Sequence, residues 1–284
     1  MLRFAANRTT MQLKKILVPC DLKEESFTAL YHAAHIAKRA GAEIALLHLE
    51  FTERAMNASQ QELQQWAERM KAFHDGDVTV HVRKGGVVGE IPAFAKEYGC
   101  GLIVMPTHGM RGMQRLTGSL ALRVVSESHI PFIIVQGRTM RDHGYKKLVI
   151  PVDYRHQLTE ECAAFVQLAL LFRSEVHLVL KKVNAELTDE KLLLSVKQTF
   201  TNAGIEVHIH EVDHKTHFTK ELVRYAGAID ADLICAVNFS YEYLYTLFPR
   251  SEEEDLIYND GQIPVLLITP EDQDEVIYNI PMRF

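Results

Sequence analysis

Three short apolar segments in the first half of the chain recur in the second half at nearly constant spacing. The paired segments are residues 14–21 and 146–153, residues 102–105 and 233–236, and residues 130–135 and 263–268. The offsets are 132, 131 and 133 residues. Three pairs of similar segments that keep this spacing indicate a duplicated domain. The 284 residues leave room for two domains that each bury a core.

The repeat also predicts where the domains begin and end. We expect an N-terminal arm over residues 1–12, a first domain over residues 13–137, a linker over residues 138–145, a second domain over residues 146–270 and a C-terminal tail over residues 271–284. The linker is placed there because the stretch is polar and flanked by glycines.

Inside each half, short apolar runs alternate with amphipathic stretches, which is typical of βαβ units on a parallel sheet. In the first half we expect strands at residues 16–19, 43–49, 78–82, 102–105 and 132–135. Helices are expected at residues 25–39, 60–73, 91–98 and 119–128, and the second half repeats this order. The predicted fold class is α/β, with two tandem doubly wound five-stranded parallel-sheet domains and helices on both faces.

Small and polar residues follow the first and fourth predicted strands of the first half. Asp21 lies just after the first strand, and a loop that ends in Gly118 and Ser119 follows the fourth. A loop of this kind, opening a helix with a Gly-Ser pair, can hold a phosphate on backbone N–H groups. In doubly wound sheets, ligands bind outside the carboxyl ends of the strands where the strand order reverses. The sequence therefore predicts a ligand site at this edge.

Together these motifs resemble the universal stress protein family in its tandem two-domain form. They are ILVPCD at residues 16–21, LLHL at residues 46–49, and LIVMPTHG at residues 102–109 running on to Gly118 and Ser119. The resemblance covers nearly the whole chain. It implies a Rossmann-like, adenine-nucleotide α-hydrolase-like fold and a cytoplasmic stress-response regulator. It also implies that the N-terminal domain binds ATP with Mg²⁺, with little or no turnover.

The resemblance also assigns the site residues. They are Pro19, Asp21, Leu49, Thr107, His108, Gly109, Gly112, Gly118 and Ser119. By resemblance, Asp21 contacts the adenosine end and Leu49 lines the adenine pocket, whereas Gly109, Gly118 and Ser119 hold ribose and phosphates. The residues alone leave a structural alternative open, in which Asp21 caps the following helix and the Gly-Ser pair only ends a loop and caps the next helix.

The chain departs from the family pattern at two points in this loop. ATP-binding members carry Gly-x2-Gly-x9-Gly followed by Ser or Thr. Here Pro106 replaces the first glycine, and eight residues separate Gly109 from Gly118. Proline lacks a backbone donor and fixes φ, so that wall of the pocket must be built differently.

The second half lacks this loop. Residues 237–260 contain no glycine, so the backbone there cannot approach a phosphate in the same way. Residues 252–255 are four consecutive acidic residues, whose carboxylates would repel a triphosphate. We therefore expect no ATP binding of the same kind there, although Pro151 and Asp153 are kept. The aromatic residues of this segment either fill the vacated pocket or form an interface.

Charge and hydropathy narrow the choice of partners. A net charge of −6 argues against nucleic acid, and no apolar run approaches the length of a membrane span. The expected ligand is an adenine nucleotide, and the expected macromolecular partner is another protein or a second copy of the chain. The two domains are also expected to pair with each other. One competing hypothesis is a nucleotide-independent scaffold with two vestigial pockets. A third is an enzyme that transfers adenylyl groups, against which stands the absence of Ser-Gly-Gly after the first strand.

No catalytic residues and no metal site are predicted. The stretch HEVDH at residues 210–214 matches the zinc-protease pattern, but that pattern works only on a helix, and here it continues an alternating strand. The alternative left open is that His208, His210, His214 and His217 bind a metal in another way. Four cysteines without CxxC spacing predict neither a disulfide framework nor a zinc knuckle.

Overall fold

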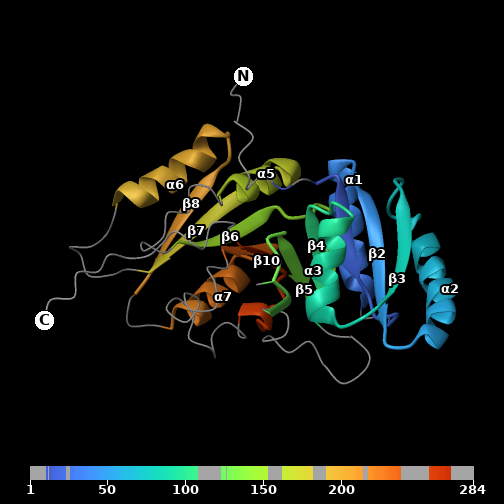
Figure 1. Cartoon of the computed structure of the whole chain (residues 1–284). Helices are drawn as coiled ribbons and strands as arrows, with labels where there is room; N and C mark the ends of the chain where they lie inside the picture. The colour runs from blue at the N-terminus through green and yellow to red at the C-terminus, as the bar shows by residue number, and fades with distance from the viewer. Residues whose placement is uncertain are drawn as a thin grey trace, which may run out of the picture.

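The strands of both halves belong to a single sheet. The computed structural model describes residues 11, 13–23, 26–107, 123–125, 127–152, 162–181, 190–213, 217–237 and 256–269. Within these residues ten strands pair in the order β3-β2-β1-β4-β5-β10-β9-β6-β7-β8 (Figure 1). The two halves of the chain thus occupy the two halves of one sheet.

The first half alternates strands and helices as predicted. Its elements are β1 (Lys15–Pro19), α1 (Phe27–Ala40), β2 (Glu43–Glu50), α2 (Glu53–Met70), β3 (Val78–Lys84), α3 (Val87–Glu97), β4 (Leu102–Pro106) and β5 (Phe132–Val135). Neighbouring strands here are parallel. Helix α1 ends at Gly41, whose φ of 64° is the left-handed conformation that glycine tolerates. Helices α2 and α3 begin earlier than expected, and half of the helix expected at residues 119–128 lies outside the described residues.

The second half has the same strand order as the first. Its elements are β6 (Lys147–Val152), α5 (Cys162–Phe172), β7 (Glu175–Lys181), α6 (Glu190–Asn202), β8 (Val207–Val212), α7 (Phe218–Ala228), β9 (Leu233–Val237) and β10 (Val265–Ile268). The order β8-β7-β6-β9-β10 matches β3-β2-β1-β4-β5 position by position. The predicted α/β fold class is confirmed.

Helices cover both faces of the sheet. Strand residues such as Val18 and Leu178 pack with the buried side chains of α1, α2, α5 and α6. Their strand neighbours Leu17 and Val179 face the opposite way and pack with α3 and α7. This alternation follows from the two-residue period of a strand, and it gives each face of the sheet its own apolar core.

One antiparallel contact joins the two halves. Strands β5 and β10 pair through Phe132 with Leu267, Ile133 with Leu266, and Ile134 with Val265. Because the strands within each half are parallel, this junction points the carboxyl ends of the two halves toward opposite edges of the sheet. Sequence analysis predicted two five-stranded sheets and did not predict their fusion into one.

The stretch predicted as a linker is anchored in both halves. Tyr145 is buried, and its O–H donates to Nδ1 of His32 on α1 at 2.7 Å. The Nε2–H of His32 donates to the Arg138 carbonyl at 2.9 Å. The Arg138 guanidinium reaches the second half, where it contacts Asp230 at 2.9 Å and the Ala231 carbonyl at 2.9 Å. The connection therefore forms part of the interface between the halves.

None of the described helices has the length and apolar character that crossing a membrane would require. All four cysteines lie among the described residues, where they are buried and form no disulfide bond.

We predict that acid destabilises the protein through His32. Burial lowers the pKa of His32 from 6.5 to about 4, although its hydrogen bond to Arg138 opposes the change. Between these values the unfolded chain takes up a proton that the folded protein excludes. The free energy of unfolding therefore falls as the pH falls, by about 3 kcal/mol across the window.

Chemical unfolding at several pH values between 6.5 and 4 tests this prediction. The variant His32→Gln should show a shallower loss of stability with falling pH. The control His143→Gln replaces an exposed histidine of the same connecting stretch and should follow the parent. A pH dependence that His32→Gln leaves unchanged would contradict the assignment.

Candidate functional site

The strand order reverses between β1 and β4, and the predicted site lies at that edge. From β1 the chain proceeds outward to β2 and β3, then returns to β4 on the other side of β1. Pro19 is the last residue of β1, Leu49 lies one residue before the end of β2, and Thr107 directly follows β4. Because these three strands are adjacent and parallel, the structure places the three residues along one carboxyl edge.

Asp21 lies two residues beyond β1 and is 1% exposed. Its Oδ1 accepts hydrogen bonds from the Ser26 hydroxyl at 2.5 Å and from the Lys23 backbone N–H at 3.2 Å. Its Oδ2 is buried, lies 3.3 Å from the Lys23 ammonium, and accepts no hydrogen bond within the described part of the chain. Ser26, and not Asp21, is the N-cap of α1. Asp21 thus holds the turn before the helix through one oxygen and leaves the other incompletely satisfied.

Apolar residues occupy the carboxyl ends of β1 and of its two neighbouring strands. Pro19 is buried, and Leu49 is half-buried and packs against the core on the α3 face of the sheet. Pro106 is buried as the last residue of β4, paired with Val135 of β5. Pro106, which stands where the family pattern has its first glycine, is therefore the last residue of a strand. The other predicted residues, His108, Gly109, Gly112, Gly118 and Ser119, lie outside the described residues, and their roles remain predictions.

A polar network at the end of β2 was missed by sequence reasoning. His48 contacts the Cys20 carbonyl through Nδ1 at 2.8 Å and Glu50 Oε1 through Nε2 at 3.2 Å. The Ser59 hydroxyl donates to the same Glu50 oxygen at 2.5 Å, and this bond is the main reason that the pKa of Glu50 is lowered. The network ties the carboxyl end of β2 to β1 beside Asp21. The one signal for it was a histidine inside an apolar strand, at position 48 of LLHL.

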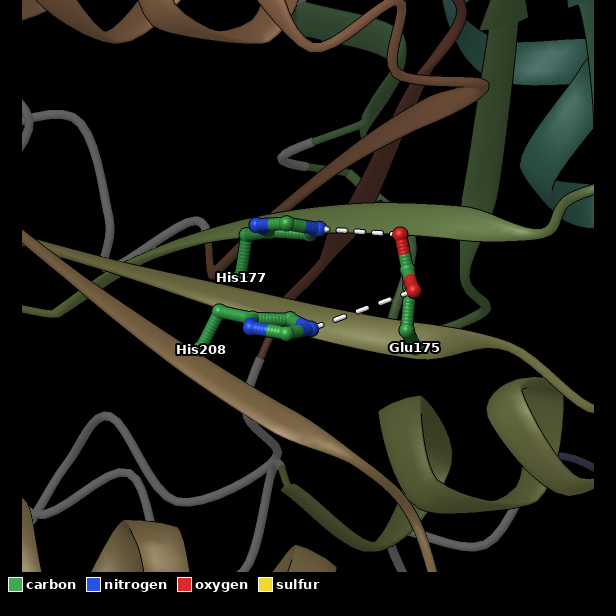
Figure 2. Close-up of side chains that lie close together, drawn as sticks. All are labelled: Glu175, His177 and His208. Atoms are coloured by element: carbon green, nitrogen blue, oxygen red, sulfur yellow. Dashed lines mark hydrogen bonds and ion pairs between the residues drawn. The ribbon is translucent and has the colours of Figure 1, made fainter.

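In the second half, the described residues include a histidine cluster but not the loop region. Asp153 and the aromatic residues at positions 239–248 lie outside the described residues. The stretch after Glu206 is strand β8, as predicted, so the zinc-protease interpretation of residues 210–214 fails for the reason expected. His208 instead lies beside His177 of β7, and both rings face Glu175 (Figure 2). Burial lowers the pKa of His177, against the opposing effect of Glu175.

Comparison with known proteins finds a family match for the first half and a shared fold for nearly the whole chain. Residues 12–136 match the universal stress protein family. A universal stress protein of Methanocaldococcus jannaschii is 29% identical over 139 residues, which span 43% of this chain and 82% of that protein.

Two solved structures resemble the whole chain. The structure of a universal stress protein from Archaeoglobus fulgidus has a TM-score of 0.70 at 18% identity, covering 94% of this chain and 100% of that one. A functionally unknown protein from Pseudomonas aeruginosa has a TM-score of 0.63 at 16% identity, covering 93% and 95%. These likenesses show that the fold is shared over more than nine-tenths of this chain.

We predict that Asp21→Ala lowers the free energy of unfolding by about 1–2 kcal/mol, because the Ser26 hydroxyl and the Lys23 N–H lose their acceptor. Asp21→Asn should cost less, since its amide oxygen can still accept both bonds. Urea unfolding of the two variants and the parent measures the difference. Equal stability of Asp21→Ala and the parent would show that the carboxylate does not hold this turn.

Proposed function

We propose that the chain is a tandem universal stress protein and a regulator of the stress response, because residues 12–136 match the universal stress protein family. Its N-terminal half binds ATP with Mg²⁺ and turns it over slowly or not at all. Its C-terminal half, which lacks the glycine loop, binds no ATP in this way. The output of the protein is a change in its own conformation or an interaction with a protein partner.

The observation that carries the proposal is the second carboxylate oxygen of Asp21. Among the described residues this buried oxygen accepts no hydrogen bond, which is costly, and the nearby Lys23 ammonium offsets only part of that cost. An amine or hydroxyl of adenosine could donate to this oxygen. Asp21 lies where the strand order reverses, which is the place where doubly wound sheets bind their ligands.

The surroundings of Asp21 suit the other parts of a nucleotide. Leu49 offers a partly exposed apolar side chain at the end of β2, against which a base can pack. The glycine-containing loop leaves the sheet at Thr107, at the end of β4, and β4 pairs with β1. Backbone N–H groups of that loop would then be available to the phosphates beside Asp21.

Binding without catalysis is proposed because no motif in the sequence supplies the groups for phosphoryl transfer. Phosphoryl transfer relies on cationic clamps and a residue that positions the nucleophile. The candidate loop offers neither a Gly-Lys-Ser/Thr segment nor paired carboxylates.

Titration calorimetry of the full chain with ATP and Mg²⁺ tests the proposal. We expect one site per chain, weakened roughly 10-fold to 100-fold by Asp21→Ala, which removes a charge-assisted hydrogen bond. Gly118→Val should abolish binding by placing a side chain where the backbone must approach the phosphates.

Two control variants separate a direct contact from a general disturbance. Ser26→Ala removes a partner of Asp21 but keeps its carboxylate, so it should retain most of the affinity. Asp153→Ala changes the corresponding residue of the second half and should bind like the parent. No binding by the parent would favour the nucleotide-independent scaffold instead. Loss of binding in Asp153→Ala would contradict the assignment to the first half.

A further inference from the structure

Three potential metal ligands converge at the amino ends of β7 and β8. Nε2 of His177 lies 3.3 Å from Oε1 of Glu175, and Nε2 of His208 lies 3.8 Å from its Oε2. One ligand atom from each of the three residues lies within 4.8 Å of the ligand atoms of the other two. Figure 2 shows both imidazoles turned toward the carboxylate from neighbouring strands.

The local geometry of the sheet creates this convergence. Glu175 and His177 are two residues apart on β7, so their side chains project from the same face. His177 pairs directly with His208 in the parallel register, and their rings stack at 4.6 Å. Both ring edges thus point in one direction, toward Glu175.

The spacing is close to that of a bound divalent ion. Tetrahedral zinc has bonds of about 2.0–2.1 Å to imidazole nitrogen and carboxylate oxygen, which places ligand atoms about 3.3 Å apart. His208, whose side chain is 42% exposed, opens to solvent and can rotate toward the other two ligands. Solvent can supply a fourth ligand through the same opening.

Tyr225 of α7 provides the outer contact that such a site requires. Its hydroxyl lies 2.9 Å from Nδ1 of His177, and its ring stacks on His210 at 4.0 Å. Without a metal, Nε2–H of His177 donates to Glu175 and Nδ1 accepts from Tyr225. When Nε2 binds a metal, the ring proton resides on Nδ1 and donates to the Tyr225 oxygen. This hydrogen bond would fix the ring orientation and the tautomer.

Two further charged groups border the cluster. The Lys147 ammonium lies 4.0 Å from Glu175 Oε1 and donates to the Ile229 carbonyl at 3.0 Å. The exposed carboxylate of Glu206 lies 3.3 Å from Nε2 of His208. Glu206 can offset the charge of Lys147 or serve as a further oxygen ligand, so the surroundings do not oppose a cation.

The first half has the same strand pairs but not the ligands. Glu43 occupies the position of Glu175 and contacts Lys15 at 3.5 Å, as Glu175 contacts Lys147. The cross-strand pair that corresponds to His177 and His208 is Ala45 and Thr79. The ion pair is thus common to both halves, whereas the two imidazoles belong to the second half alone.

We propose that Glu175, His177 and His208 bind one divalent transition-metal ion, with Zn²⁺ as the favoured metal. Two imidazoles and a carboxylate with an open fourth position are a donor set that zinc uses, and imidazole disfavours Mg²⁺ and Ca²⁺. The site lies in the half that the proposed ATP site does not use, so each proposal can fail without the other.

Titration of the tag-free full chain with Zn²⁺, in competition with a chromophoric chelator, tests the proposal. We expect one site per chain, weakened at least 100-fold in His208→Gln and in Glu175→Gln. Tyr225→Phe, which removes only the outer hydrogen bond, should weaken binding about 10-fold. The control His81→Gln replaces the histidine that occupies the position of His210 in the first half, away from the ligand set, and should leave the affinity unchanged.

A second measurement identifies the ligands if a variant folds poorly. Co²⁺ bound to the parent chain should give visible absorption typical of nitrogen and oxygen ligands, without the intense near-ultraviolet bands of thiolate. Circular dichroism of each variant confirms its fold. Zn²⁺ affinity that survives the double variant His177→Gln/His208→Gln, or a parent that binds Zn²⁺ no better than Mg²⁺, would overturn the proposal.

Discussion

The antiparallel pairing of β5 with β10 is the constraint on which the rest of the structure depends. Both strands are buried along their whole length, and each would be an exposed apolar edge if its half stood alone. Exposed edges of this kind invite pairing with other chains, and joining the two removes both edges at once. The free edges of the ten-stranded sheet are β3 and β8, which carry polar side chains such as Arg83 and His208. The same junction points the carboxyl ends of the two halves in opposite directions, so a site at the end of one half is remote from the corresponding site of the other.

Within this shared scaffold the two halves differ in the side chains placed at equivalent positions. The first half presents Asp21 and Leu49 where the strand order reverses, next to the start of a glycine-containing loop. The second half has histidines where the first has Ala45 and Thr79. One strand framework can therefore support a proposed nucleotide site in one half and a proposed metal site in the other. The contacts of the buried His32 and Tyr145 and of the half-buried Arg138 connect the two halves.

Much of the fold could be predicted from the sequence because its signals are local. The strand Phe132–Val135 was predicted with the bounds that the structure shows. The union of the two sheets could not be predicted, since two short apolar strands carry no information about which edge each will meet. The stretch around Arg138 and Tyr145 looked like a polar linker because its contacts are with residues distant in sequence.

The candidate sites show the same division between local and distant information. Asp21, Leu49 and Thr107 lie at strand ends as predicted, because a strand end can be recognised in the sequence, whereas their role in a site stays a prediction. The contact between His177 and His208 depends on the register between β7 and β8, which no sequence motif specifies. The zinc-protease pattern instead involves residues spaced along one strand.

The most direct test of the account is amide hydrogen exchange of the full chain with ATP and Mg²⁺, and separately with Zn²⁺. The account predicts that ATP protects the carboxyl ends of β1, β2 and β4, and that Zn²⁺ protects the amino ends of β7 and β8. Equal protection of both halves by either ligand, or protection by neither, would contradict the division of function between them.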